Sequence, residues 1–117
     1  MEKPNVTFTP KELMDKLLST RDGLTSLIQS TYTFEETLGD KITVDQYKDL
    51  SQIRNILNKL LDGVNSSLYI EDKSFTKGEL ASMDYFYTLG SDMNNLEKSY
   101  AQMLAAGETS KMLSLII

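Results

Sequence analysis

The chain has 117 residues, with 12 Lys and Arg against 17 Asp and Glu for a formal net charge of −5, and it contains no histidine, cysteine or tryptophan. Without histidine or cysteine it cannot form a thiolate nucleophile, a Ser-His or Cys-His catalytic pair, a zinc finger or a disulfide. An acidic chain without a dense block of Lys and Arg also lacks the positive charge that binding to a nucleic-acid backbone requires, so we expect no direct nucleic-acid binding.

The length and composition indicate one folded domain spanning residues 1–117. This size is typical of a single domain, and a hydrophobic content of 40% with a charged content of 25% is ordinary for soluble globular proteins. The N-terminal residues lack the basic region and apolar run of a signal peptide, and the longest apolar runs are far too short to span a bilayer. We therefore expect a cytoplasmic protein with no membrane partner.

The most specific pattern in the sequence is a hydrophobic residue, a threonine, two further residues, a Glu or Gln, and another hydrophobic residue. It occurs three times, at residues 8–13, 42–47 and 75–80, with the threonine at Thr9, Thr43 and Thr76. A threonine at the N-cap accepts a hydrogen bond from the backbone N–H three residues on, while the Glu or Gln there accepts one from the N–H of the cap. The flanking hydrophobic residues occupy the two positions of a hydrophobic staple. The pattern therefore predicts three helix starts.

The first predicted helix, about 10–38, places its apolar residues three and four apart and stops before Gly39. The second, about 44–69, and the third, about 77–106, carry similar apolar stripes, and the third stops near Gly107. A repeat of helix pairs would also fit the regular spacing of the starts, but one long helix per segment explains it more simply. We expect an all-α fold, an antiparallel three-helix bundle with a short apolar C-terminal segment.

Three glycines, Gly23, Gly63 and Gly90, interrupt the apolar stripes, and glycine weakens a helix by about 1 kcal/mol relative to alanine. Each is a position where a helix could break. At Gly63 the second helix either continues or ends in a C-terminal cap. After Gly90, the residues Ser91 and Asp92 favour N-caps over helix interiors, so a kink there is an alternative to a continuous helix.

Carboxylates are the only abundant residue type with catalytic potential. The acidic groups that lie close in sequence are Asp45 with Asp49, and Glu35 and Glu36 with Asp40. Neither set has the ligand spacing and central glycine of a calcium loop, and the serines and lysines belong to no nucleophile elbow or phosphate-binding loop. We therefore interpret the acidic residues as solvated helix faces and predict no enzyme activity, no metal or cofactor, and no small-molecule substrate.

Two parts of the chain are candidates for binding another protein or a second copy of the chain. Tyr85 and Tyr87 flank a phenylalanine on the third predicted helix, where successive residues turn by about 100°, so at least one of the three rings lies near the surface. These tyrosines either pack in the core with their hydroxyls at its rim or form a contact surface. The apolar tail contributes Met112, Leu113, Leu115, Ile116 and Ile117. It either folds back over the bundle as a short fourth element or docks on a partner.

These observations favour a small acidic helical protein that binds another protein through helix-to-helix contacts, as an adaptor, a secretion or assembly chaperone, or a phage-type accessory factor. Two alternatives stay open. One is an inhibitor of a nucleic-acid-handling or defence enzyme, although the negative charge is spread along the chain rather than arranged at phosphate-like spacing. The other is a structural subunit of a larger assembly that the apolar tail anchors.

Overall fold

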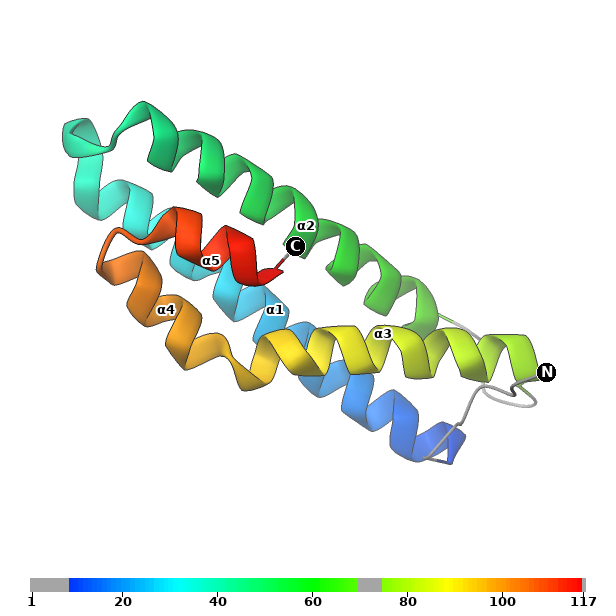
Figure 1. Cartoon of the computed structure of the whole chain (residues 1–117). Helices are drawn as coiled ribbons and strands as arrows, with labels where there is room; N and C mark the ends of the chain where they lie inside the picture. The colour runs from blue at the N-terminus through cyan, green and yellow to red at the C-terminus, as the bar shows by residue number, and fades with distance from the viewer. Residues whose placement is uncertain (1–8, 70–74, 117) are drawn as a thin grey trace.

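The computed structural model describes residues 9–69 and 75–116, and within these residues it contains five α-helices, one 3-10 turn and no β-strand (Figure 1). The helices are α1 (Pro10–Leu38), α2 (Val44–Leu68), α3 (Lys77–Asn95), α4 (Glu97–Ala105) and α5 (Thr109–Ile116), and the 3-10 turn spans Gly39–Lys41. The prediction of an all-α fold is confirmed. The prediction of three helices is wrong, because the third segment is two helices and the tail forms a fifth.

The helices form an elongated bundle whose Cα atoms extend over 52 × 27 × 19 Å. α1 runs along the bundle and α2 returns antiparallel to it (Figure 1). α3 packs on both α1 and α2, α4 continues along α1, and α5 packs on α2 and α4. One half of the molecule is therefore built from α1, α2 and α3, and the other half from α1, α2, α4 and α5.

All three predicted helix starts are confirmed as capping boxes at Thr9, Thr43 and Thr76. Each threonine hydroxyl accepts from the backbone N–H three residues on at 3.0–3.2 Å, and the side chain of that residue accepts from the threonine N–H at 2.9–3.1 Å. At the first start, the hydrogen bond from the Thr9 N–H lowers the pKa of the Glu12 carboxyl. α1 ends where the sequence predicted, because Gly39 takes a φ of +53°.

The third predicted helix, 77–106, is wrong as a single element, because it is divided at Leu96. The backbone there leaves the helical conformation with φ −97° and ψ 5°, and the Leu96 N–H donates to the carbonyls of Asp92 and Met93 at 3.2 Å. The bend therefore lies beyond Gly90 rather than at it. Leu96 follows Met93 at the spacing of an apolar stripe, but the residue is 43% exposed at the bend.

The three glycines that interrupt the apolar stripes lie inside continuous helices, so none of them breaks an element. Each instead allows two helices to approach closely, because a Cβ atom there would overlap a neighbouring side chain. The contacts pair Gly23 with Asn94, Gly63 with Phe86 and Gly90 with Thr20. Two of these pairs join α1 to α3, and the third joins α2 to α3. The closer packing offsets the weak helix propensity of glycine.

The core consists of one inward row on each helix. α1 contributes Leu13, Leu17, Leu24 and Leu27, α2 contributes Leu50, Ile53, Leu57 and Val64, and the other helices contribute Met83, Tyr100, Leu104 and Met112. Burying a side chain of this kind stabilises the fold by about 1.5–3 kcal/mol relative to leaving it in water. No described helix is both long enough and apolar enough to cross a bilayer.

Replacing Gly90 by alanine tests the close contact between α1 and α3. The new methyl group would overlap the Cγ2 methyl of Thr20, and overpacking of this kind costs about 1–3 kcal/mol. We therefore expect Gly90→Ala to lower the free energy of unfolding by about that amount in urea denaturation.

Two controls accompany this variant. Gly78→Ala, in the first turn of α3, meets nothing closer than the Thr76 hydroxyl at 3.9 Å and should leave stability unchanged or slightly raised. Thr20→Ser removes the opposing methyl group, so adding it to Gly90→Ala should recover part of the loss. Simple additivity of the two substitutions would contradict the contact.

A second prediction concerns high pH. Burial, helped by the nearby Asp92 carboxylate, raises the pKa of the Tyr100 hydroxyl above its ordinary value of 10.0. The folded chain therefore holds this proton more tightly than the unfolded chain. The resulting stabilisation is complete below about pH 10 and is lost as the pH rises through the raised pKa of the folded state. Denaturation measured against pH should show a shallower alkaline decline in Tyr100→Phe, and equal slopes in the two proteins would rule the effect out.

Candidate functional site

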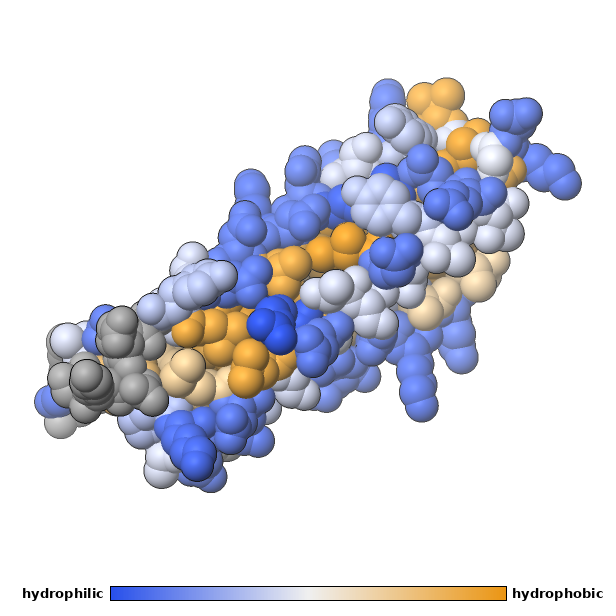
Figure 2. Space-filling model, turned by 180° about the vertical axis from the view of Figure 1, so that it is seen from behind, coloured by the Kyte–Doolittle hydropathy of each residue, from blue (hydrophilic) through white to orange (hydrophobic). Residues whose placement is uncertain are grey.

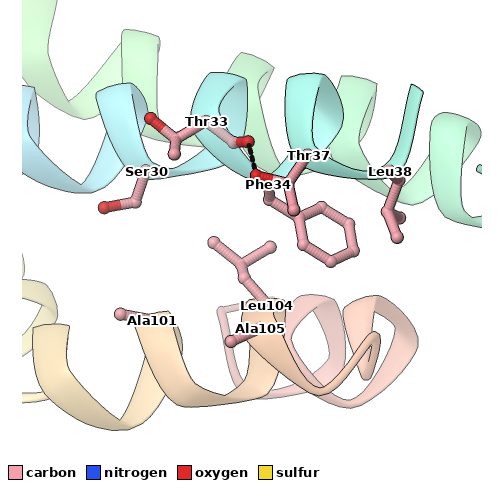
Figure 3. Close-up of a pocket in the computed structure, with 8 residues that line it drawn as sticks. All are labelled: Ser30, Thr33, Phe34, Thr37, Leu38, Ala101, Leu104 and Ala105. Atoms are coloured by element: carbon pink, nitrogen blue, oxygen red, sulfur yellow. Dashed lines mark hydrogen bonds between the residues drawn. The ribbon is translucent and has the colours of Figure 1, made fainter.

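An open groove of about 330 Å³ lies between the C-terminal half of α1 and α4. It is lined by Ser30, Thr33, Phe34, Thr37 and Leu38 of α1 and by Ala101, Leu104 and Ala105 of α4. Figure 3 shows Phe34 and Leu104 pointing toward each other from the two helices, and both side chains are buried. The groove therefore has an apolar floor and small side chains along its walls.

The polar groups of the groove already have partners in their own helix. The hydroxyl of Ser30 donates to Ser26 O at 3.1 Å, and that of Thr33 donates to Gln29 O at 3.2 Å. The hydroxyl of Thr37 donates to Thr33 O at 2.8 Å, the hydrogen bond drawn in Figure 3. Bonding back to the preceding turn uses the hydroxyl proton and leaves carbon atoms as most of the accessible surface. None of the lining residues is ionisable, so the groove presents a largely apolar surface.

Six of the eight lining residues lie in two stretches of the chain that contain no charged residue, 23–34 in α1 and 99–107 in and after α4; the other two, Thr37 and Leu38, follow Glu35 and Glu36. In a chain with 25% charged residues, the two uncharged stretches face each other across one surface. Charged residues resume at Glu35, Lys98 and Glu108. Depletion of charge is typical of the centre of a protein interface. The α1–α4 groove is therefore the candidate docking site.

The face of the molecule seen in Figure 2 carries both apolar and hydrophilic residues. Apolar residues form a narrow strip there, and hydrophilic side chains border the strip and partly cross it. Scattered apolar residues are normal on the surface of a protein, and the strip on this face is divided by hydrophilic side chains.

The predicted aromatic contact residues point in different directions from α3. The Tyr85 side chain is 59% exposed, and its ring meets that of Phe86 edge-on at a centroid distance of 5.2 Å. Phe86 fills the space above Gly63 of α2. Tyr87 is half-buried, and the Nζ atom of Lys16 of α1 lies 5.8 Å from the centre of its ring. A role for Tyr85 or Tyr87 in partner binding stays a prediction.

The apolar tail folds back on its own chain as α5, one of the two outcomes that the sequence left open. Met112 is fully buried and Leu113 is buried beside it, in a helix that packs on α2 and α4. Leu115 is 54% exposed, Ile116 is half-buried, and Ile117 lies outside the described residues. Met112 and Leu113 are therefore unavailable to a partner while α5 is docked, and binding by the last residues of the tail stays a prediction.

An arginine network that the sequence analysis missed joins α1 to α2. The Nε atom of Arg54 donates to Thr31 Oγ1 at 2.9 Å, and Nη2 donates to Thr31 O at 3.0 Å. Nη1 pairs with the buried Oε1 of Glu35 at 2.8 Å, and the guanidinium lies 3.9 Å from the ring centre of Tyr32. The planar guanidinium thus forms hydrogen bonds, an ion pair and a stacking contact together. A signal for it existed in Thr31, a polar residue within the apolar stripe of α1.

The acidic residues considered as cation ligands have other roles where their partners are defined. The Oδ2 atom of Asp49 accepts hydrogen bonds from Thr109 Oγ1 at 2.9 Å and from Ser110 Oγ at 2.7 Å, which ties α5 to α2. Glu35 is paired with Arg54. Over residues 9–69 and 75–116, no three acidic side chains gather closely enough to hold a metal ion.

Replacing Arg54 by lysine tests the arginine network. Lysine keeps the charge but cannot form both hydrogen bonds to Thr31 or lie flat against Tyr32, so we expect chemical denaturation to show a loss of about 1–3 kcal/mol. Arg21, the other arginine of the chain, is partly exposed and contacts Asp22 at 3.5 Å. Arg21→Lys should therefore change stability by less than about 0.5 kcal/mol. Equal losses in the two variants would show that the network adds nothing specific.

Comparisons of the chain with models of known protein families, with characterised proteins and with solved structures find no match.

Proposed function

We propose that this chain is a protein-binding module that receives an apolar α-helix of a partner protein in the groove between α1 and α4. The proposal is carried by the lining of the groove, which combines an apolar floor with hydroxyls already bonded to the backbone. A helix with an apolar stripe is suited to such a surface, because the stripe brings no polar group that would need a partner. Recognition of this kind supports the role of an adaptor or chaperone.

The shape of the groove also supports a helix as its occupant. Ala101 and Ala105 on α4, and Ser30 on α1, project little from their helices. A partner helix can therefore approach closely and direct larger apolar side chains toward Phe34 and Leu104 on the floor. A small molecule is a poorer fit, because pockets for small ligands also place polar groups that fix the orientation of the ligand.

Inserting one negative charge into the groove tests this proposal. Thr33 is exposed on its wall, and glutamate is a better helix former than threonine, so Thr33→Glu should fold normally. The partner's apolar stripe would then face an unpaired carboxylate, and we expect at least a tenfold loss of binding, equivalent to about 1.4 kcal/mol. The measurement is affinity capture from a lysate of the source organism, quantified by mass spectrometry.

Thr25→Glu is the matched control. Thr25 is also exposed on α1, its hydroxyl donates to Arg21 O at 2.8 Å just as Thr33 donates to its own preceding turn, and it does not line the groove. Proteins bound through the groove should be captured by the wild type and by Thr25→Glu but not by Thr33→Glu. Their capture should persist at about 1 M salt, where the screening length is only about 3 Å. Identical capture by both variants would contradict the proposal.

A further inference from the structure

A short helix, α4, forms one wall of the α1–α4 groove. It has nine residues, Glu97–Ala105, and an isolated helix of that length is unstable in water. Its N-cap, Leu96, makes no side-chain hydrogen bond. α4 packs on α1 on one side and on α5 on the other, and α5 lies between α4 and α2 (Figure 1). The position of this wall therefore depends on the helices beside it.

The end of α4 and the start of α5 share one turn. The N–H of Gly107, which has a φ of +80°, donates to Leu104 O at 3.0 Å. The N–H of Glu108 donates to Met103 O at 2.7 Å. Together these two bonds make a Schellman motif, which satisfies carbonyls at the C-terminus of α4. The Glu108 carbonyl in turn accepts from the N–H of Met112 in α5 at 3.1 Å. Displacing the first turn of α5 therefore removes the cap of α4.

Two side chains of α2 hold this shared turn. The Oδ2 atom of Asp49 accepts from the hydroxyls of Thr109 and Ser110, at 2.9 and 2.7 Å. Thr109 is buried, so without Asp49 its hydroxyl would lose a partner in the interior of the protein. The Nε2 atom of Gln46 donates to Gly107 O at 3.3 Å. Neither Asp49 nor Gln46 lines the groove, so both act on its α4 wall through the shared turn.

Gln46 also distinguishes the second capping box from the other two. The residue three positions after the cap is a glutamate, Glu12 or Glu79, in the first and third boxes. In the second box the Oε1 atom of Gln46 accepts from the Thr43 N–H at 3.0 Å, and Nε2 is left to donate to Gly107 O. A glutamate would close the box equally well but has no N–H to donate. The glutamine thus joins the start of α2 to the turn between α4 and α5.

We propose that Gln46 and Asp49 are positioning residues for the α1–α4 groove, which hold its α4 wall in place through the turn at Gly107 and the docked helix α5. Leu104 and Ala105, which line the groove, are the last two residues of α4 before this turn. Where it concerns binding, the inference rests on the proposed function: a partner helix binds the groove only while α5 is docked. Such coupling is reciprocal, so an occupied groove also stabilises the docking of α5.

Gln46→Glu tests the positioning in the protein alone. The substitution keeps the capping box and removes the hydrogen bond to Gly107 O. We expect amide hydrogen exchange, followed by NMR, to become about threefold faster or more at residues 100–105 of α4 and in α5, with unchanged rates in α3. Gln29→Glu, at an exposed position on α1, adds the same charge and should leave both helices as in the wild type.

Three results would overturn the positioning role. Exchange in Gln46→Glu could rise in α5 alone, which would show that α4 keeps its place without the turn. It could rise equally in every helix, which would mean a loss of overall stability. It could also match that of Gln29→Glu throughout.

A pair of variants at Asp49 tests the other contact. Asp49→Ala removes the acceptor of both hydroxyls, whereas Asp49→Asn keeps an oxygen that can accept from them. We expect exchange at residues 100–105 and in α5 to become about tenfold faster or more in Asp49→Ala, and to stay closer to the wild type in Asp49→Asn. Equal effects of the two substitutions would show that the hydroxyl contacts do not hold the turn.

A measurement with a bound partner separates failure of the coupling from failure of the proposed function. The partner is a purified protein that the wild type and Thr25→Glu capture and Thr33→Glu does not. At a concentration of about 100 times its dissociation constant, we expect it to slow exchange in α5 by at least about tenfold in the wild type and to have no effect in Thr33→Glu. Slower exchange in α4 without any change in α5 overturns the coupling and leaves groove binding intact. If no such partner exists, the proposed function fails, and the exchange rates of the free protein alone decide whether Gln46 and Asp49 position the wall.

Discussion

The methyl group of Thr20 occupies the space in which a side chain at Gly90 would lie, and the ring of Phe86 occupies the corresponding space above Gly63. These contacts hold α3 close to both α1 and α2. The bend at Leu96 then directs α4 along α1 and leaves the flank of α2 beyond α3 to be covered by α5. The α1–α4 groove and the surface of α2 and α4 that α5 covers therefore both depend on where α3 ends.

Local chemistry explains which parts of the fold could be predicted. α1 was predicted correctly at both ends, because its start carries a capping box at Thr9 and its end carries Gly39. The division at Leu96 was missed because neither proline nor glycine marks it and the apolar spacing continues through it. Gly63 and Gly90 were ambiguous for a different reason. Helix propensity alone predicts that any glycine inside a helix destabilises it. Only the packing of Phe86 against Gly63 and of Thr20 against Gly90 shows that these positions have no room for a side chain.

The candidate site depends on pairings between distant parts of the chain, which a sequence pattern does not contain. Nothing local relates Thr33 to Ala105, although both line the same groove. The tail was recognised as apolar, but Met112 and Leu113 would be buried equally well on their own chain or on a partner. In the structure the tail packs on its own chain, and Asp49 accepts hydrogen bonds from Thr109 and Ser110, which lie about 60 residues further along the sequence. The same holds for charge. The net charge of −5 does not reveal that residues from two uncharged stretches of the chain line one groove.

The three capping boxes also bear on the order in which the chain folds. Each box is closed by residues only three positions apart, so its formation costs little loop entropy and eases the unfavourable nucleation of a helix. The first turns of these three helices can therefore form from local contacts alone. α4, whose N-cap Leu96 makes no side-chain hydrogen bond, lacks this local start and therefore depends more on its packing against α1 and α5. Because synthesis begins at the N-terminus, α1, α2 and α3, which carry capping boxes, are made before α4, which has none.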